Sequence, residues 1–281
     1  MTVPRIAIPS KGRLRESVMD LLKHAGYSLS AFKGASASAV VEGIEFIEMR
    51  PRDAAAWLRA GRLDAAFIST DTALENEVED WPSIELGMAS SDLIVACRED
   101  APFTSAHDLE GKIVATHLPN WTVRWFKQLG VEANVMAMGG SLEGVVAVGL
   151  ADAIVDLRET GGSLVRNRLH AIEEGVRCQA IFTTSPQPVA GIADLQLRIG
   201  AALEARKTQF VLLHIPADKV DELGQLFPGL AAPTVLPLAG RTDLVAAQMV
   251  VKRSNLWGRL GELRALGASG IVALPTDAIL E

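Results

Sequence analysis

The residues best suited to chemistry lie between positions 149 and 164. Ala153-Ile154-Val155 is a short apolar run, typical of a buried parallel strand, and the carboxylate of Asp156 follows it. Thr160-Gly161-Gly162-Ser163 then places two glycines between hydroxyls, before a helix that we predict over 164–174. Glycines let a backbone approach an anion, hydroxyls donate hydrogen bonds, and a helix N-terminus attracts negative charge. The stretch therefore indicates a phosphate site, and an ordinary strand-to-helix turn with a capping serine is the open alternative.

Two basic stretches nearer the N-terminus are further candidates for anion binding. Lys11-Gly12-Arg13 lies between a predicted strand and a predicted helix. Arg50 follows the next predicted strand, and Asp53 is the expected N-cap of the helix after it. Basic side chains at strand ends face a ligand if those ends line a cleft, and are otherwise solvated surface charges.

A short pattern occurs twice in the chain. Gly61 and Gly149 each begin Gly-x-x-Asp-Ala, followed by an apolar strand and a polar loop with an acid, which in the first copy is Asp71. The repetition suggests two α/β lobes, each presenting a strand end to a shared cleft. Glu143 lies in the first turn of a helix predicted over 142–148, where it either satisfies the helix dipole or points at this cleft.

The pattern changes after Arg206. The strands predicted in this tail cover 210–215, 234–238, 245–251 and 270–274, and the helices cover 219–226 and 255–266. This βαββαβ order is the signature of a ferredoxin-like domain. We therefore place a domain boundary near Arg206, with a tail suited to binding a regulator or to assembly.

Composition limits the classes of partner. The chain has 281 residues and a net charge of −7, which gives no general attraction to nucleic acid or to an anionic membrane. An anionic ligand would therefore need a local basic site. The two cysteines, Cys97 and Cys178, fit a reducing compartment. No signal-peptide core and no apolar run of about 20 residues is found, so we expect a cytoplasmic protein.

Several kinds of catalytic site have no sequence signature here. The five histidines and two cysteines show no zinc spacing, and neither a nucleophile elbow nor a Walker A motif is present. A Mg²⁺ ion carried in by a phosphate ligand would need only one or two carboxylates. The sequence therefore favours binding and positioning of phosphates over covalent catalysis.

These pieces together resemble the ATP phosphoribosyltransferases of histidine biosynthesis, in their long form with a C-terminal regulatory domain. The resemblance runs nearly from end to end, and its most specific part is the stretch 149–164. The other matching stretches are 9–14, 50–53, 140–143, 228–238 and 267–272.

The resemblance implies the first reaction of histidine biosynthesis. Adenine N1 of ATP displaces pyrophosphate from C1 of phosphoribosyl pyrophosphate, giving phosphoribosyl-ATP. Asp156 and Glu143 would be catalytic, and with Asp152 would contact the ribose hydroxyls or the Mg²⁺, which arrives with the pyrophosphate substrate and is not held by protein alone. The phosphate loop would comprise Thr160, Gly161, Gly162, Ser163 and Leu164. The nucleotide or pyrophosphate would face Lys11, Gly12, Arg13, Arg50 and Asp71.

The resemblance also implies an architecture. The catalytic domain, 1–205, would resemble a type II periplasmic binding protein, with lobe I at about 1–90 and 178–205 and lobe II at about 91–177. The α+β domain at 206–281 would resemble ACT domains, bind histidine for feedback inhibition, and help to form a homo-oligomer, from dimer to hexamer. Nucleic acid and membrane are not expected partners.

The sequence departs from the family pattern at a few positions. Ala66 and Ser69 stand where the family usually has glycines, and a Cβ there can narrow the approach of the backbone to a ligand. Val145 and Val146 replace a usual proline, 274–277 replaces a usual Pro-Ile-Glu ending, and Ser163 keeps the hydroxyl of a usual threonine. Two alternatives follow: a binding or regulatory paralogue without turnover, and a glycosyl transferase that uses another nucleophile.

Overall fold

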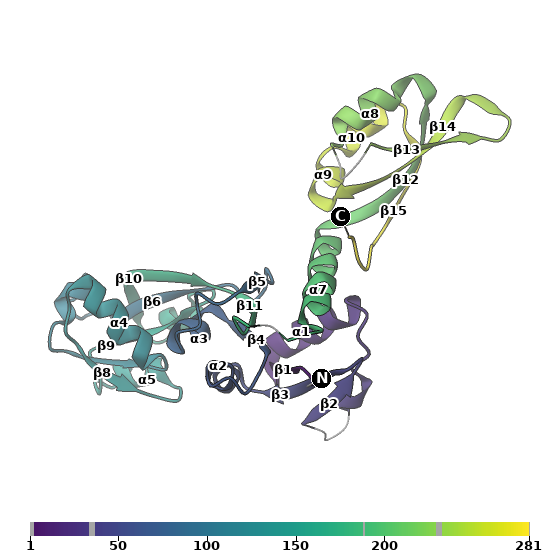
Figure 1. Cartoon of the computed structure of the whole chain (residues 1–281). Coiled ribbons are helices and arrows are strands. Elements are labelled where there is room, and N and C mark those ends of the chain that lie inside the picture. Colours follow the sequence, from purple (N-terminus) through teal and green to yellow (C-terminus); the bar gives the residue numbers. More distant parts are fainter. Residues whose placement is uncertain (1–2, 34–36, 188, 229–231, 281) are drawn as a thin grey trace. The chain divides into compact units, whose positions relative to one another are not determined.

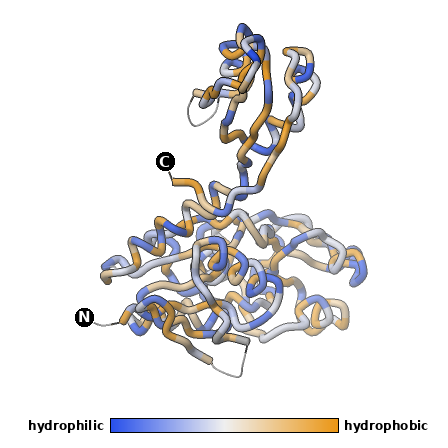
Figure 2. Tube along the Cα trace, turned by 90° about the vertical axis from the view of Figure 1, so that its right-hand side faces the viewer, coloured by the Kyte–Doolittle hydropathy of each residue, from blue (hydrophilic) through white to orange (hydrophobic). Residues whose placement is uncertain are grey.

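The structure is a computed structural model that describes residues 3–33, 37–187, 189–228 and 232–280. The chain forms two compact units, Met1–Met19 with Leu29–Ala193 and Asp20–Ser28 with Asp194–Glu281. In Figure 2, hydrophobic and hydrophilic residues alternate at short intervals along the whole trace. None of the described helices is long and apolar enough to cross a membrane.

The first unit contains two sheets, of which one has six strands in the order β2-β3-β1-β4-β11-β5. β1 lies between β3 and β4 and is parallel to both, and its residues Ile6, Ala7 and Ile8 are buried, as is typical of a parallel strand covered on both faces. We call this sheet and the helices between its strands the first lobe. Its elements are β1 (Arg5–Pro9), α1 (Gly12–His24), η1 (Ser30–Lys33), β2 (Ser38–Val41), β3 (Ile44–Met49), α2 (Pro51–Arg59), β4 (Ala65–Ser69), α3 (Thr70–Glu75), β5 (Ser83–Glu85) and β11 (Ala180–Thr184).

The other sheet has five strands in the order β10-β6-β9-β7-β8, and we call it with its helices the second lobe. β9 is parallel to β7 and antiparallel to β6. The helices α4 and α5 lie on opposite faces of the sheet (Figure 1). Trp121 and Phe126 of α4 are buried on one face, and Leu142 of α5 and Leu164 of α6 on the other. The elements are β6 (Ser91–Arg98), η2 (Ala106–Leu109), β7 (Ile113–Thr116), α4 (Pro119–Leu129), β8 (Asn134–Ala137), α5 (Leu142–Ala147), β9 (Ala153–Arg158), α6 (Gly162–Arg166) and β10 (Leu169–Cys178).

The predicted helix over 164–174 is wrong beyond Arg166. α6 ends at Arg166, and the chain continues as the edge strand β10, antiparallel to β6. β10 has register shifts between Ala171 and Glu173 and between Glu174 and Arg177, and its middle residues are charged and partly exposed. An irregular, charged edge strand has no clean alternation of apolar residues, so its sequence resembles an exposed helix.

The second unit contains the four-stranded antiparallel sheet that the tail predicts, in the order β13-β14-β12-β15. This order and the βαββαβ sequence of elements confirm the ferredoxin-like fold. The predicted helix over 255–266 is two helices, with Arg259 between them. Residues 229–231 of the matching stretch 228–238 lie outside the described residues. The elements are α7 (Ile192–Lys207), β12 (Thr208–Pro216), η3 (Ala217–Lys219), α8 (Val220–Leu226), β13 (Thr234–Leu238), β14 (Arg241–Lys252), α9 (Arg253–Gly258), α10 (Leu260–Ala265) and β15 (Ser269–Leu274).

Candidate active site

The carboxyl ends of parallel strands carry the polar residues of both lobes. Asp71 follows β4 in the first lobe, and in the second lobe His117 follows β7 while Asp156 lies in the second half of β9. Ligands of open α/β sheets bind at this edge because the strand ends and the following loops converge there. The topology therefore brings these side chains to one region of the first unit.

Asp156 is mostly buried and lies among other charged groups. Its Oδ1 accepts a hydrogen bond from the Leu157 N–H at 2.7 Å and lies 3.5 Å from His117 Nδ1. Burial raises the pKa of the Asp156 carboxyl, and the nearby carboxylates of Glu143 and Asp71 raise it further, against the opposing effects of Leu157 and His117. The structure thus brings Asp71 and Glu143 within electrostatic reach of Asp156. Such an acidic group favours a ligand that carries hydroxyl donors or positive charge.

Asp71 is the most buried of these acids, with 4% of its surface exposed. It lies in the first turn of α3, and its Oδ1 has no hydrogen-bond partner among the described residues. Buried polar atoms are nearly always hydrogen-bonded, so an oxygen without a partner indicates a place for a donor or cation from a ligand. Asp71 therefore fits the ligand-binding role that its position after β4 predicts.

The predicted phosphate loop connects β9 to α6. Gly161 has a φ of 76°, in the left-handed region where glycine is favoured, and it occupies the N-cap position of α6. Leu164 is buried and anchors the helix, while Thr160 is exposed. Asn167 donates from Nδ2 to the main-chain O of Ser163 at 2.9 Å. The first N–H groups of a helix have no acceptor within it, so this loop presents free donors beside its two hydroxyls.

Arg158 holds the strand end just before this loop. Its guanidinium donates two hydrogen bonds of 2.8 Å to the Glu174 carboxylate of β10 and lies 3.4 Å from Asp92 of β6. The hydrogen bonds to Glu174 raise the pKa of Arg158. These contacts link the strands β9, β6 and β10 next to the predicted phosphate loop.

The basic stretch at the start of α1 lies next to the same loop. Gly12 has a φ of 79°, which turns the chain from β1 into the helix. Arg13 Nη2 pairs with Oε2 of Glu159, the residue before Thr160, at 2.5 Å. A cavity of about 520 Å³ is lined by Lys11, Gly12, Arg13, Leu14, Ser17, Ala89, Ser90 and Glu159.

Two predicted site residues are not brought to this region by contacts. Arg50 is exposed at the N-cap position of α2, and Asp53, the expected N-cap, instead lies in the first turn of that helix. The Asp152 carboxylate accepts the Ile113 N–H at 2.9 Å at the start of β7. Asp152 precedes Asp156 by four residues, which is about 13 Å along a strand, so it lies at the opposite edge of the sheet.

Ala66 and Ser69 of β4, which stand where glycines are expected, have structural roles. Ala66 is fully buried and packs with Ala54 and Leu58 of α2 in the core of the first lobe. Ser69 precedes α3, and its N–H donates to Thr72 Oγ1 at 3.1 Å, while the two hydroxyls lie 3.4 Å apart. Ser69 therefore helps to fix the N-terminus of the helix that carries Asp71.

The structure adds two residues that the sequence reasoning missed. Glu159 pairs with Arg13, and His117 contacts Asp156. His117 also lines a cavity of about 320 Å³ between the lobes, with Arg52, Glu75, Pro119, Ala137, Met138 and Gly139. His117 follows the apolar run of β7 much as Asp71 follows β4, so a polar residue just after an apolar run was a usable signal.

No group of three or more His, Cys, Asp or Glu side chains within the described ranges is placed to hold a metal ion. Asp71 and Asp156 nevertheless supply carboxylate oxygens, which are the protein ligands that Mg²⁺ uses when most of its shell comes from water and phosphates. The donor set thus fits an ion that enters with a phosphate ligand.

Known protein families match most of the chain. A family model described as ATP phosphoribosyltransferase matches residues 50–201, and one described as HisG, C-terminal domain, matches 205–278. The ATP phosphoribosyltransferases of Methanococcoides burtonii and Parabacteroides distasonis are each 32% identical to the chain, covering 98% of it and 99% of their own length.

Solved structures are similar in fold. A chain of the ATP phosphoribosyl transferase (HisG:HisZ) complex from Thermotoga maritima is 28% identical with a TM-score of 0.59, and the match covers 70% of this chain and 98% of that one. XAC2383 from Xanthomonas citri, bound to ATP, is 15% identical with a TM-score of 0.50, covering 73% and 84%, which shows a likeness of fold alone. With the two family models and the relatives of nearly full length, the chain belongs to the ATP phosphoribosyltransferase family of histidine biosynthesis.

Proposed function

We propose that the chain transfers the phosphoribosyl group of phosphoribosyl pyrophosphate to N1 of ATP. The lone pair of N1 forms the bond to C1 of the ribose, and the electron pair of the broken C1–O bond leaves with pyrophosphate. The observation that supports this reaction most is the acidic group of Asp71, Glu143 and Asp156 beside the loop 160–164. The reaction needs binding and charge stabilisation rather than a protein nucleophile.

In this proposal the loop binds the 5-phosphate, and the carboxylates bind and stabilise the ribose. The main-chain N–H groups of the loop and the hydroxyls of Thr160 and Ser163 bind the 5-phosphate. The carboxylate of Asp156 accepts hydrogen bonds from the ribose hydroxyls, and with Glu143 stabilises the positive charge that develops on the ribose ring. Asp71 lies on the opposite side of this ring.

Pyrophosphate and the nucleotide would bind toward the first lobe. Lys11 and Arg13 supply positive charge to the leaving group, next to the free N–H groups at the start of α1, and Arg50 at the end of β3 faces the nucleotide phosphates. Mg²⁺ enters with the pyrophosphate and neutralises part of its charge. In this scheme the Arg13 guanidinium leaves the Glu159 carboxylate and pairs with the pyrophosphate of the substrate instead.

The ferredoxin-like tail would regulate the enzyme. We place catalysis in residues 1–205 and histidine binding in residues 206–281, with feedback inhibition and a homo-oligomer between dimer and hexamer as the result. The family match of the tail supports this division. The expected compartment is the cytoplasm.

The direct assay follows the adenine absorbance with ATP, phosphoribosyl pyrophosphate and Mg²⁺, and with pyrophosphatase to draw the reaction forward. Wild-type protein should form product, and histidine should inhibit it. Asp156→Ala should abolish turnover, and Thr160→Ala should raise KM for phosphoribosyl pyrophosphate about tenfold, the value of one hydrogen bond to a charged group. Asp152→Ala, at the residue just before β9, is the matched control. Binding of both substrates without product would favour a paralogue that has lost turnover.

A further inference from the structure

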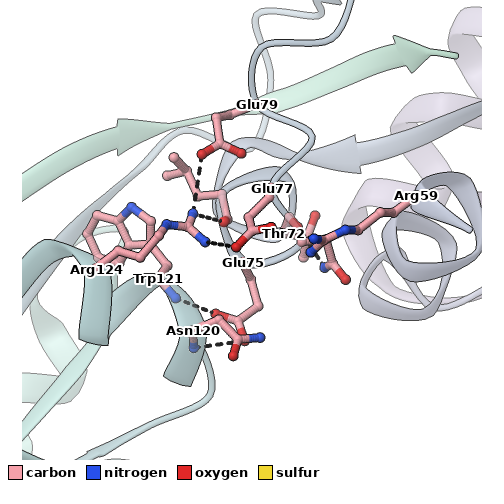
Figure 3. A network of polar contacts seen from close by, with 10 residues as sticks. Arg59, Thr72, Glu75, Glu77, Glu79, Asn120, Trp121 and Arg124 are labelled. Carbon is pink, nitrogen blue, oxygen red and sulfur yellow. Dashed lines mark hydrogen bonds and ion pairs between the residues drawn. The ribbon is translucent and has the colours of Figure 1, made fainter. Parts of the chain in front are cut away.

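The two lobes of the first unit are joined by contacts between α3 and α4, shown in Figure 3. α4 begins at Pro119, which has no N–H, after Leu118, whose side chain cannot accept a hydrogen bond. The next two N–H groups, of Asn120 and Trp121, donate to the Glu75 carboxylate at 3.2 and 2.9 Å. Glu75 ends α3 in the other lobe and is 7% exposed. The first lobe therefore caps a helix that its own sequence leaves uncapped.

Arg124 of α4 makes the reciprocal contact. Its guanidinium donates to the main-chain O of Leu74, near the C-terminus of α3, and pairs with Glu77 at 3.1 Å and Glu79 at 3.2 Å. Glu77 also pairs with Arg59 of α2, so the network reaches a third helix (Figure 3). An anion at a helix N-terminus and a cation at a helix C-terminus are both favourable. Two opposite charges thus link the lobes at the ends of two helices.

These contacts lie between the two sides of the candidate active site. α3 carries Asp71 in its first turn, and α4 follows His117, which contacts Asp156. We propose that Glu75 and Arg124 are positioning residues that hold Asp71 at the separation from Asp156 that catalysis requires. The kinetic part of this proposal rests on the proposed function, and its structural part does not.

If Glu75 and Arg124 only stabilised the fold, their loss would lower Tm without a specific loss of rate. The Arg124 ion pairs are partly exposed, and such pairs contribute at most about 1 kcal/mol, so Arg124→Ala should change Tm little. A shift of reacting groups by about 1 Å can reduce a rate about 100-fold. A large loss of rate with little change in Tm in Arg124→Ala would therefore distinguish an effect on the placement of the lobes from an effect on stability. Glu75→Gln retains an oxygen that can accept one of the two N–H groups, and should recover part of what Glu75→Ala loses.

The kinetic experiment compares kcat with the binding of ligands that need only one lobe. We expect kcat of Glu75→Ala and Arg124→Ala to fall about 10- to 100-fold. The Kd values of ribose 5-phosphate and of ATP, each measured alone, should change less than about twofold because each lobe is intact. Arg98→Ala, which removes a surface pair with Asp100 in the second lobe, is the matched control. An unchanged kcat, or equal losses in kcat and in both affinities, would overturn the proposal.

A distance measurement tests the same proposal without any turnover. Spin labels are attached through Ala56→Cys on α2 and Gln128→Cys on α4, which are both exposed. Burial raises the pKa of the native Cys97 thiol to about 11 and of Cys178 to about 12, so labelling at neutral pH selects the new sites.

The wild-type background should give a narrow distribution of distances between the labels, and Glu75→Ala and Arg124→Ala should broaden or shift it. Identical distributions in all backgrounds would refute the positioning role. If wild-type protein forms no product, the proposed function fails, and the distance measurement alone decides this inference.

Discussion

Asp156 combines its proposed role in the site with an environment that disfavours its ionised form. Burial and two nearby carboxylates raise its pKa, so the folded protein binds a proton there more tightly than the unfolded chain does. The ionised carboxylate therefore reduces the free energy of unfolding at neutral pH. This penalty shrinks as the pH falls below the folded-state pKa, and it is gone below the unfolded-state pKa, where the carboxyl is protonated in both states.

We expect Asp156→Asn to raise Tm at neutral pH while it lowers kcat by about 100-fold or more, the loss typical of a charged group that stabilises the transition state. The gain in Tm should shrink as the pH is lowered below the folded-state pKa. Thermal unfolding across the acidic range, beside turnover assays, checks both parts. A Tm that is lower than wild type at neutral pH would show that the carboxylate stabilises the fold.

Asp152 should have the opposite effect to Asp156, because its carboxylate should stabilise the fold. It accepts the Ile113 N–H at the far edge of the sheet. Asp152→Ala should lower the free energy of unfolding by about 1 kcal/mol, the typical value of one hydrogen bond. The KM for phosphoribosyl pyrophosphate should stay at its wild-type value. A large increase in that KM would place Asp152 in the site.

At the scale of elements, the two glycines of the proposed phosphate loop differ in backbone conformation. Gly161 has a left-handed φ, and a side chain there is strained by about 1–2 kcal/mol, so Gly161→Ala should lower Tm and weaken substrate binding. Gly162 has no such φ, and the nearest atom to an added Cβ is 3.8 Å away. Gly162→Ala should therefore leave Tm unchanged and weaken only the binding of phosphoribosyl pyrophosphate. Titration calorimetry with thermal unfolding distinguishes the two variants, and equal effects of both on Tm would contradict this division.

The sequence predicts local elements and the residues at their ends better than it predicts contacts between distant elements. The strand before Asp156, the glycine loop and the βαββαβ tail follow from local pattern and agree with the structure. The edge strand β10 was missed because register shifts and charges hide its alternation. The cap of α4 was beyond prediction because its acceptor, Glu75, is 45 residues away along the chain and in the other lobe.

At the scale of the whole molecule, one face of the C-terminal sheet has no helix over it among the residues that the structure describes. α8, α9 and α10 pack on the face that carries Val211, Leu213 and Met249. The register of the strands places a second set of apolar residues on the opposite face, where Val272 and Leu274 are 45% and 50% exposed. The set comprises Phe210, Leu212, Val250, Val272 and Leu274.

An exposed apolar face of this kind is suited to association with other copies of the chain. Light scattering after size-exclusion chromatography should show that Val272→Asp shifts the protein to smaller species, because the new charge would be buried at the contact. Gln225→Asp, on the exposed surface of α8, adds the same charge and should have no effect. Identical masses for the two variants would exclude this face from assembly.

The central claim is that this one chain joins C1 of the ribose to N1 of adenine at the site around Asp156. The most direct test uses ATP with a nitrogen-15 label at N1 and phosphoribosyl pyrophosphate with a carbon-13 label at C1, in a single reaction followed by NMR. We predict a product with one-bond coupling between the two labels, formed by wild-type protein and at least about 100-fold more slowly by Asp156→Asn. Ribose 5-phosphate released by hydrolysis, or a product in which the labels are not coupled, would contradict the account.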